Sequence, residues 1–214
     1  MYTRVKNYLQ LSIFTFLMNA GVDNDNNQVV DLIYSDVFRY YNKGDCFHLR
    51  KGLLEHPGLK FLFFFRLASR RPKNFVRKKI HNWSFYFFRR YFYKYGFQIP
   101  LATEIGRGFQ ILHFGNIVFN PTCTIGINCT VAQGVLIGQS NRGVPRIGNQ
   151  VWIGANAILV GNIVVGSNVL IAPGAYVNVN VPDNSLVIGN PCTIYPKTTS
   201  IIDGYIVNRV PAIS

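Results

Sequence analysis

The chain has 214 residues, 49% of them hydrophobic and 14% aromatic, and its formal net charge is +13. This length and hydrophobic content suit one or two domains with a buried core and exclude intrinsic disorder. So high a charge suggests nucleic acid or an anionic surface as a partner. However, residues 1–98 carry 17 of the 22 Lys and Arg and six of the nine Asp and Glu, so the excess belongs to the first half and residues 99–214 are nearly neutral.

Neither a targeting segment nor a metal site is indicated. Polar residues interrupt the mildly apolar stretch from Leu9 to Met18, so we expect an ordinary helix there. The densest apolar run, residues 61–65, falls far short of the roughly eighteen residues that a membrane span needs. The cysteines form no CxxC pair and no zinc-finger spacing with the histidines, so we expect reduced, buried thiols in a cytosolic protein and no metal. These cysteines are Cys46, Cys123, Cys129 and Cys192.

Residues 1–98 have the pattern of an α-helical domain. Apolar residues recur at helical spacing over residues 29–38 and 59–68. Aromatic and basic residues crowd residues 60–97, and no acidic residue occurs between Glu55 and Glu104. Two interpretations of this basic, aromatic-rich segment are open. It is either a contact between subunits with Lys and Arg at its rim, or a peripheral anchor on an anionic membrane face.

The second half shows an internal repeat of six residues. Aliphatic side chains recur in phase, with one step of eight and one of ten residues, at Ile99, Ile105, Ile111, Ile117, Ile125, Val131, Ile137, Ile147, Ile153, Leu159, Val165, Ile171 and Val177. A period of six fits neither a helix nor a hairpin sheet. It predicts a mainly β fold, a left-handed parallel β-helix over residues 99–181, with an aliphatic residue inside each corner of a triangular prism. The step of ten predicts a loop over residues 139–146, and residues 182–214 are expected to form a turn and a tail.

The motifs resemble the hexapeptide-repeat acyltransferases, and within them the serine acetyltransferase branch, over roughly residues 30–197. The matching landmarks are Ile105-Gly106-Arg107-Gly108, Leu112-His113 with Ile117-Val118, Val131-Ala132-Gln133-Gly134-Val135, Pro145-Arg146-Ile147 and Gly189-Asn190-Pro191. The resemblance implies acetyl transfer from acetyl-CoA to a hydroxyl, in a homotrimer whose active sites lie between neighbouring prisms, with a dimer of trimers left open. By position it also implies an acetyl-CoA site that comprises Gly138, Ala155, Pro173 and Lys197.

The same resemblance makes His113 the general base. Two residues after the corner residue Ile111, its imidazole can point outward from the prism. An alcohol attacks a thioester at neutral pH only when a base takes its proton, and a histidine suits that task. The other histidines lie in the helical half and are expected to be structural or solvated: His48, His56 and His81.

The sequence departs from the serine acetyltransferase pattern at residues that would bind an amino acid. Leu112 and Gln98 stand where that branch has Asp, and Gly143-Val144 stands where it has Arg-His. Without those charges, the ammonium and carboxylate of serine would be left unpaired, which is costly. The segment 112–116 looks like a subgroup in which sugar acceptors are expected. Uncharged polar residues are the candidate contacts to sugar hydroxyls: Asn116, Gln133 and Asn141.

We therefore expect an acetyl-CoA-dependent O-acetyltransferase that modifies a sugar in surface polysaccharide biosynthesis. It is expected in the cytoplasm, with peripheral contact to the inner membrane face left open. The alternative enzyme is a serine O-acetyltransferase of cysteine biosynthesis, and the alternative without catalysis is a β-helix scaffold or sugar-binding module. Nucleic acid is not expected as a partner, because no recognised binding motif supports it.

Overall fold

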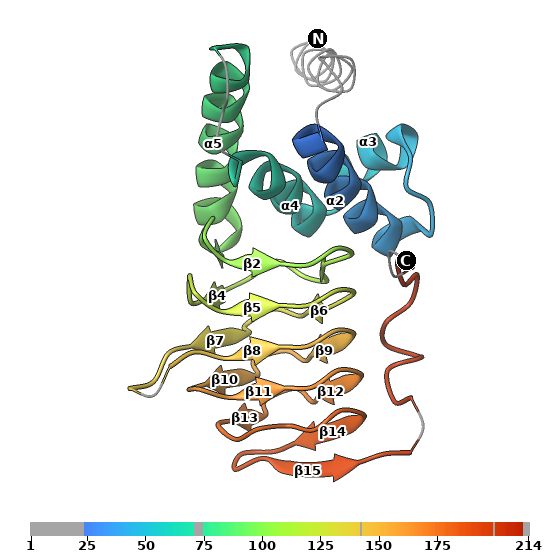
Figure 1. Ribbon diagram of the computed structural model, residues 1–214, viewed down its shortest axis with the longest axis vertical. Helices are drawn as coiled ribbons and strands as arrows, with labels where there is room; N and C mark the ends of the chain where they lie inside the picture. Colours follow the sequence, from blue (N-terminus) through green and yellow to red (C-terminus); the bar gives the residue numbers. More distant parts are fainter. Residues whose placement is uncertain (1–23, 71–74, 142, 199, 212–214) are drawn as a thin grey trace.

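The structure is a computed structural model that describes residues 24–70, 75–141, 143–198 and 200–211. In this part of the chain a group of helices lies on one end of a β-helix (Figure 1). The helices are α2 (Asn24–Tyr41), α3 (Cys46–Glu55), α4 (Pro57–Ala68) and α5 (Phe75–Tyr95). The helix expected between Leu9 and Met18 lies outside the described residues. None of the described helices is both long enough and apolar enough to cross a bilayer.

Three sheets form the sides of the β-helix, and successive coils of the chain add one strand to each in parallel. Sheet A contains β1 (Phe97–Gln98), β4 (Ile117–Phe119), β7 (Leu136–Gly138), β10 (Ile158–Val160) and β13 (Tyr176–Val177). Sheet B contains β2 (Glu104–Ile105), β5 (Thr124–Ile125), β8 (Arg146–Ile147) and β11 (Val164–Val165). Sheet C contains β3 (Gln110–Ile111), β6 (Thr130–Val131), β9 (Val151–Ile153), β12 (Val169–Ile171), β14 (Ser185–Ile188) and β15 (Thr193–Pro196).

The sixfold repeat fills the interior of the prism. All thirteen aliphatic positions of the repeat are buried, most of them completely. Each such side chain contributes roughly 1.5–3 kcal/mol by leaving water, so the repeat supplies most of the force that closes the coils. The hexapeptide-repeat left-handed β-helix expected from the sequence is confirmed, and so are the helices before it.

Glycine and asparagine make the corners between sheets B and C. A Cβ on Gly106 would lie 2.7 Å from the backbone of Gly126 in the next coil, so only glycine allows the coils to approach there. Asn128 and Asn168 turn later corners in the left-handed conformation, with φ of 58° and 55°. Asparagine adopts this conformation more readily than most residues with a side chain.

The β-helix extends past residue 181, where the sixfold pattern ends. β14 pairs in parallel with β12, and β15 returns antiparallel to β14. The sixfold phase is lost because Val181, which pairs with Val165, follows Val177 after four residues, although Val181 and Val187 are still buried. Asp183 secures the corner after Val181, since its Oδ1 accepts a hydrogen bond of 2.6 Å from the Ser167 amide.

The C-terminal tail runs back along the outside of sheet C toward α2 (Figure 1). Ile202 and Ile206 are buried against Leu170, and the ring of Tyr205 lies 5.0 Å from that of Trp152. At its far end, the amide and carbonyl of Val210 form hydrogen bonds of 2.8 and 2.9 Å with the side chain of Asn128. The tail therefore covers sheet C.

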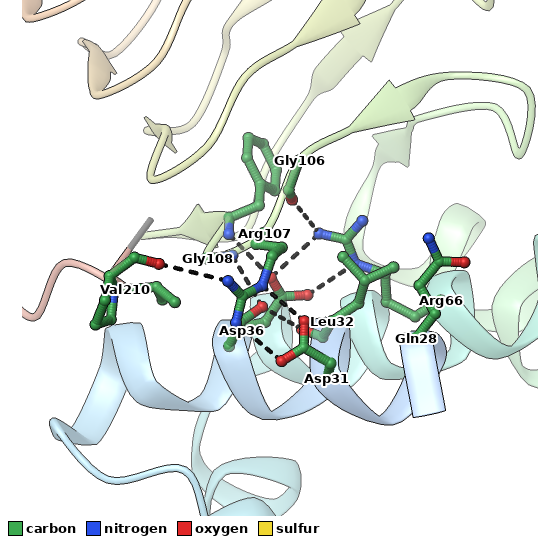
Figure 2. A network of polar contacts seen from close by, with 12 residues as sticks. Gln28, Asp31, Leu32, Asp36, Arg66, Gly106, Arg107, Gly108 and Val210 are labelled. Atoms are coloured by element: carbon green, nitrogen blue, oxygen red, sulfur yellow. Dashed lines mark hydrogen bonds and ion pairs between the residues drawn. The ribbon is translucent and has the colours of Figure 1, made fainter. Parts of the chain in front are cut away.

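Buried polar contacts join the helices to the first coil. Arg66 of α4 lies between Asp36 of α2 and the carbonyl of Gly106 (Figure 2). Arg39 of α2 is fully buried and donates to the side chains of Gln110 and Thr130 at 3.2 and 2.7 Å. Burial lowers the pKa of Arg39 to about 10, so the guanidinium is still charged at neutral pH.

Candidate active site

His113 lies in the corner that joins β3 to β4, on the edge between sheets C and A. Its side chain is exposed, and so are its neighbours Leu112, at 38%, and Phe114, at 67%. Among the described residues, no side chain or carbonyl forms a hydrogen bond with the imidazole. The ring is therefore accessible to a substrate. In a single copy of the chain, the apolar side chains of Leu112 and Phe114 are exposed to solvent.

The helical domain holds both ends of this corner. Before it, the Tyr40 hydroxyl accepts a hydrogen bond from the Ile111 amide at 3.1 Å and donates to the Ile111 carbonyl at 2.8 Å. After it, the Gly115 amide donates to the carbonyl of Tyr95, the last residue of α5, at 3.1 Å. β3 is the edge strand of sheet C, so the contacts with Tyr40 also provide hydrogen-bond partners for backbone groups that would otherwise be unpaired. Burial raises the pKa of Tyr40, which keeps its hydroxyl protonated and able to donate.

Three of the expected site residues lie along the same edge as His113. Gln133, Ala155 and Pro173 occupy the equivalent corner of the next three coils. Backbone hydrogen bonds stack these corners, from the Asn156 amide to the Gln133 carbonyl at 2.9 Å and from the Gly174 amide to the Ala155 carbonyl at 2.8 Å. In the coils that follow Gln133, this edge is lined by small residues. A Cβ on Gly174 would meet no atom within 4 Å, so this strip is open to solvent.

Gln133 has one feature that a solvated turn residue would not have. Its Oε1 is buried and has no hydrogen-bond partner among the described residues. The side chain packs against the His113 corner, because a Cβ on Gly115 would lie 3.3 Å from the Cβ of Gln133. A buried acceptor without a donor is costly, so this oxygen is available to a donor from outside the chain.

Two other expected residues lie on a different edge. Gly138 ends β7 at the edge between sheets A and B, and Asn141 is exposed in the loop that follows. The loop forms where the sequence predicted it, and Ser140 and Gly143 pair across its base. Within one chain, sheet A separates this loop from His113.

Lys197 lies on the third edge. β15 runs back along β14, so Lys197 ends beside Asn184 at the edge between sheets B and C, where its amide donates to the Asn184 carbonyl at 2.7 Å. Its exposed side chain is therefore not on the strip of Ala155 and Pro173 in the same chain. Sequence position alone did not reveal this, because the antiparallel return of β15 is outside the repeat.

The remaining expected residues are in the His113 corner or near it. Asn116 is exposed, and its side chain packs over the backbone of Gly96, where a Cβ would lie 2.9 Å from Oδ1. Gln98 is exposed on β1, in register with Val118 of β4. In the described part of the chain, no three His, Cys, Asp or Glu side chains come together in a way that could hold a metal.

Tyr40 is the site residue that the sequence did not indicate. It belongs to α2, more than seventy residues before His113. Its contact depends on how α2 lies on the first coil, which a helical apolar pattern does not specify. The only available signal was a tyrosine near the end of an apolar helix, which is far too common to single out.

Comparisons with known proteins agree with this fold. Residues 145–178 match the family described as "Bacterial transferase hexapeptide (six repeats)". Over 103 residues the chain is 40% identical to the "Putative colanic acid biosynthesis acetyltransferase WcaB" of Escherichia coli K12. These 103 residues are 47% of this chain and 64% of that protein. Over 100 residues it is 39% identical to the serine acetyltransferase of Staphylococcus aureus Mu50. These 100 residues are 45% of this chain and 47% of that protein. The matched segment thus spans about half to two thirds of these relatives.

Solved structures with the same fold cover more of the chain. The serine acetyltransferase of Neisseria gonorrhoeae in complex with serine superposes with a TM-score of 0.64 and 26% identity, over 79% of this chain and 69% of that one. A serine acetyltransferase in complex with CoA gives a TM-score of 0.64 and 23% identity, over 79% and 70% of the two chains. Residues 145–178 therefore match bacterial transferase hexapeptide repeats, and the chain is similar in sequence to WcaB and to serine acetyltransferases and shares the fold of the latter.

Proposed function

We propose that this protein transfers acetyl from acetyl-CoA to a hydroxyl of a sugar, in the biosynthesis of a surface polysaccharide, with His113 as general base. The observation that carries the proposal is the place of His113. It is an exposed histidine in a corner held from both sides by the helical domain, at one end of an open strip of small residues. The named acetyltransferase relatives support the type of reaction.

The chemistry needs one base near neutral pH. The imidazole of His113 takes the proton of the acceptor hydroxyl while the hydroxyl oxygen attacks the thioester carbonyl carbon. The C–S bond then breaks, the sulfur takes the proton back from the imidazolium, and CoA leaves as the thiol. The acetyl group remains as an ester on the acceptor oxygen, so atoms and charge balance without a further reactant.

The strip at Ala155 and Pro173 suits the arm of acetyl-CoA. Pantetheine is thin and carries amides, so it binds best where small residues leave backbone groups within reach. Both residues lie on the edge that begins at His113, so an arm along this strip points its thioester toward the imidazole. The CoA-bound serine acetyltransferase of the same fold supports an acyl-CoA substrate.

The polar groups around His113 favour a sugar over an amino acid. Gln133 offers an unpaired buried oxygen and Asn116 an exposed amide, and both suit neutral hydroxyl groups. Leu112 and Gln98 stand where the serine acetyltransferase pattern has Asp, so the ammonium of serine would lack those partners. The WcaB relative, with its name in colanic acid biosynthesis, supports the same choice.

The outer face of sheet A supports a homotrimer. Val118, Leu136, Ile158 and Tyr176 occupy consecutive rungs of this sheet and alternate with buried residues, so they form an apolar ladder on its outside. Sheet B instead presents Glu104 and Arg146, and sheet C is covered by the tail. An uncovered apolar face of this kind is suited to a second copy of the chain.

Three copies with their sheets A around a common axis would complete the site. The edges of sheet A carry His113 on one side and the loop with Gly138 and Asn141 on the other. Around a threefold axis, the loop of one copy therefore meets the His113 corner of its neighbour. This contact would also cover the exposed side chains of Leu112 and Phe114.

An acceptor panel tests the proposal. The purified chain is incubated with acetyl-CoA and, separately, with hexoses, nucleotide sugars or L-serine, and the thiol of released CoA is measured. We expect release above the hydrolysis background with at least one sugar and none with L-serine. Turnover with L-serine at the rate of the best sugar would establish the serine acetyltransferase alternative instead.

A further inference from the structure

Helix α5 has one buried face and one face that nothing in the described chain covers. Its buried face packs on α4, where the ring of Phe64 lies 5.4 Å from Trp83 and 5.1 Å from Phe87. On the opposite side are six residues spaced by three or four, which we call the outer face of α5. They are Phe75, Lys79, Asn82, Tyr86, Arg89 and Tyr93, and all are exposed. This spacing places them in one row, about 27 Å long at the helical rise.

Rings and cations alternate along this row. Phe75, Tyr86 and Tyr93 are 72%, 62% and 66% exposed, values that a soluble surface seldom gives to three aromatic rings in line. The Nζ of Lys79 lies 4.8 Å from the centre of the Phe75 ring, and the guanidinium of Arg89 lies 5.2 Å from that of Tyr93. The helix contains no acidic residue. The row is therefore both apolar and strongly positive.

The described part of the chain does not supply a suitable cover. A second copy placed face to face would set cations against cations with no carboxylate between them, which disfavours a twofold contact. The Asp and Glu residues of the chain lie before residue 56 or after residue 103, and several are engaged in ion pairs, such as Asp36 with Arg66 and Asp31 with Arg107. The partner must therefore bring its own negative charge and must also accept aromatic rings.

We propose that the outer face of α5 lies on an anionic membrane surface. Phe75, Tyr86 and Tyr93 enter the headgroup region, while Lys79, Arg89 and the adjacent Arg90 pair with the headgroup phosphates. The first turns of α5 project beyond α4 and away from the β-helix, which leaves them free to reach such a surface (Figure 1). This membrane contact does not depend on acetyl transfer. The contact would, however, bring the proposed active site to a lipid-linked sugar.

Co-sedimentation of the full chain with vesicles tests this proposal. Vesicles of phosphatidylcholine alone are compared with vesicles that contain 30% phosphatidylglycerol, at low salt and in 0.5 M NaCl. We expect binding to the anionic vesicles at low salt only. The double variant Arg89→Gln and Arg90→Gln should weaken binding roughly thirty-fold, since each basic residue near such a surface contributes about five-fold. Tyr86→Ser with Tyr93→Ser should also weaken it, although the charge is unchanged.

Matched controls come from α3 and the loop before it, in the same domain. Lys43→Gln with Arg50→Gln removes the same charge from exposed positions outside α5, and Phe47→Ser removes an exposed ring of α3. Circular dichroism and the molecular mass of each variant show whether fold and assembly persist. The proposal is overturned if anionic vesicles do not pellet the chain, or if the controls weaken binding as much as the α5 variants. It is also overturned if the α5 variants change the oligomeric state, or if the chain binds duplex DNA but not vesicles.

Discussion

Asp36 and Arg66 form a bidentate ion pair at the centre of the junction between the helices and the β-helix, with N–O distances of 2.9 and 3.1 Å. Both side chains are buried, at 1% and 3% exposure. Arg66 also donates to the carbonyls of Ile105 and Gly106, and Asp36 accepts from the Phe109 amide at 2.9 Å. Two helices are thus fixed to the corner of the first coil that precedes β3, one strand before the proposed base (Figure 2).

Replacing Arg66 with Met should strongly destabilise the protein. The change leaves the buried Asp36 carboxylate without its cationic partner and removes the Arg66 donor from two backbone carbonyls, and breaking such a pair costs about 3–5 kcal/mol. Urea unfolding measures the loss. Asp31→Asn is the control, because Asp31 pairs with Arg107 near the surface at 44% and 18% exposure and should cost less than about 1 kcal/mol. Equal losses in the two variants would contradict this account of the junction.

Tyr40→Phe should lower both stability and the rate of acetyl transfer. The variant removes the hydroxyl that pairs with the Ile111 amide and carbonyl, and leaving such groups unpaired costs roughly 1–3 kcal/mol. Because Ile111 leads into the His113 corner, we expect kcat to fall while the KM for acetyl-CoA changes little. Tyr41→Phe is the control, since that hydroxyl donates to the exposed Glu55. A normal kcat in Tyr40→Phe would show that the contact does not position His113.

Ile158→Arg should convert the proposed trimer into a monomer. The charge would stand in the middle of the apolar ladder on sheet A, where Ile158 is 37% exposed. Light scattering after size-exclusion chromatography gives the mass. Val164→Arg is the matched control, because Val164 is 44% exposed at the same coil but on sheet B. If both variants keep the wild-type mass, sheet A is not the contact face.

Mixed assemblies should recover activity that neither parent has. His113→Ala lacks the base, and a chain whose residues 140–143 are replaced by Gly-Gly lacks the loop. When the two are co-expressed, a site that combines the base of one chain with the loop of the other is complete, and random mixing gives about a quarter of the wild-type sites. Absence of any recovery, with mixed assemblies present by mass, would mean that base and loop do not share a site.

The thiols should differ in reactivity because their burial differs. Burial raises the pKa of both Cys123 and Cys129 to about 12, so almost no thiolate is present at pH 8. Cys46 and Cys192 are only partly buried. We therefore expect iodoacetamide at pH 8 to label Cys46 and Cys192 first and all four cysteines after denaturation, as read by peptide mass spectrometry. Equally fast labelling of Cys129 in the native protein would contradict its place in the core.

The sequence was sufficient for the β-helix because its core depends on a local rule. Each coil needs an aliphatic residue at fixed spacing, and the buried residues Ile111 and Leu159 obey that rule regardless of what surrounds them. The edge that carries His113, Gln133, Ala155 and Pro173 follows from the same spacing, so the corner that each of them occupies could be placed from the sequence. Lys197 does not follow it, because β15 reverses direction.

Contacts between distant segments were not predictable in this way. Tyr40 reaches Ile111, and Val210 reaches Asn128, across 71 and 82 residues. Both contacts depend on how α2 and the tail pack on the first coils, which is decided by side-chain shape and by a few buried hydrogen bonds. A periodic pattern contains no information about such packing, so the helical domain could be predicted in kind but its junction with the β-helix could not.

The rate of acetyl transfer by His113→Ala tests the central claim most directly. With the best acceptor of the panel, CoA release by this variant is compared with the wild type and with His48→Ala, which alters a histidine paired with Asp45 on the surface of α3. Loss of a general base predicts a fall in kcat of about 10²–10⁴-fold for His113→Ala and wild-type turnover for His48→Ala. A His113→Ala variant that is folded, has the wild-type mass in solution and is as fast as the wild type would contradict the account.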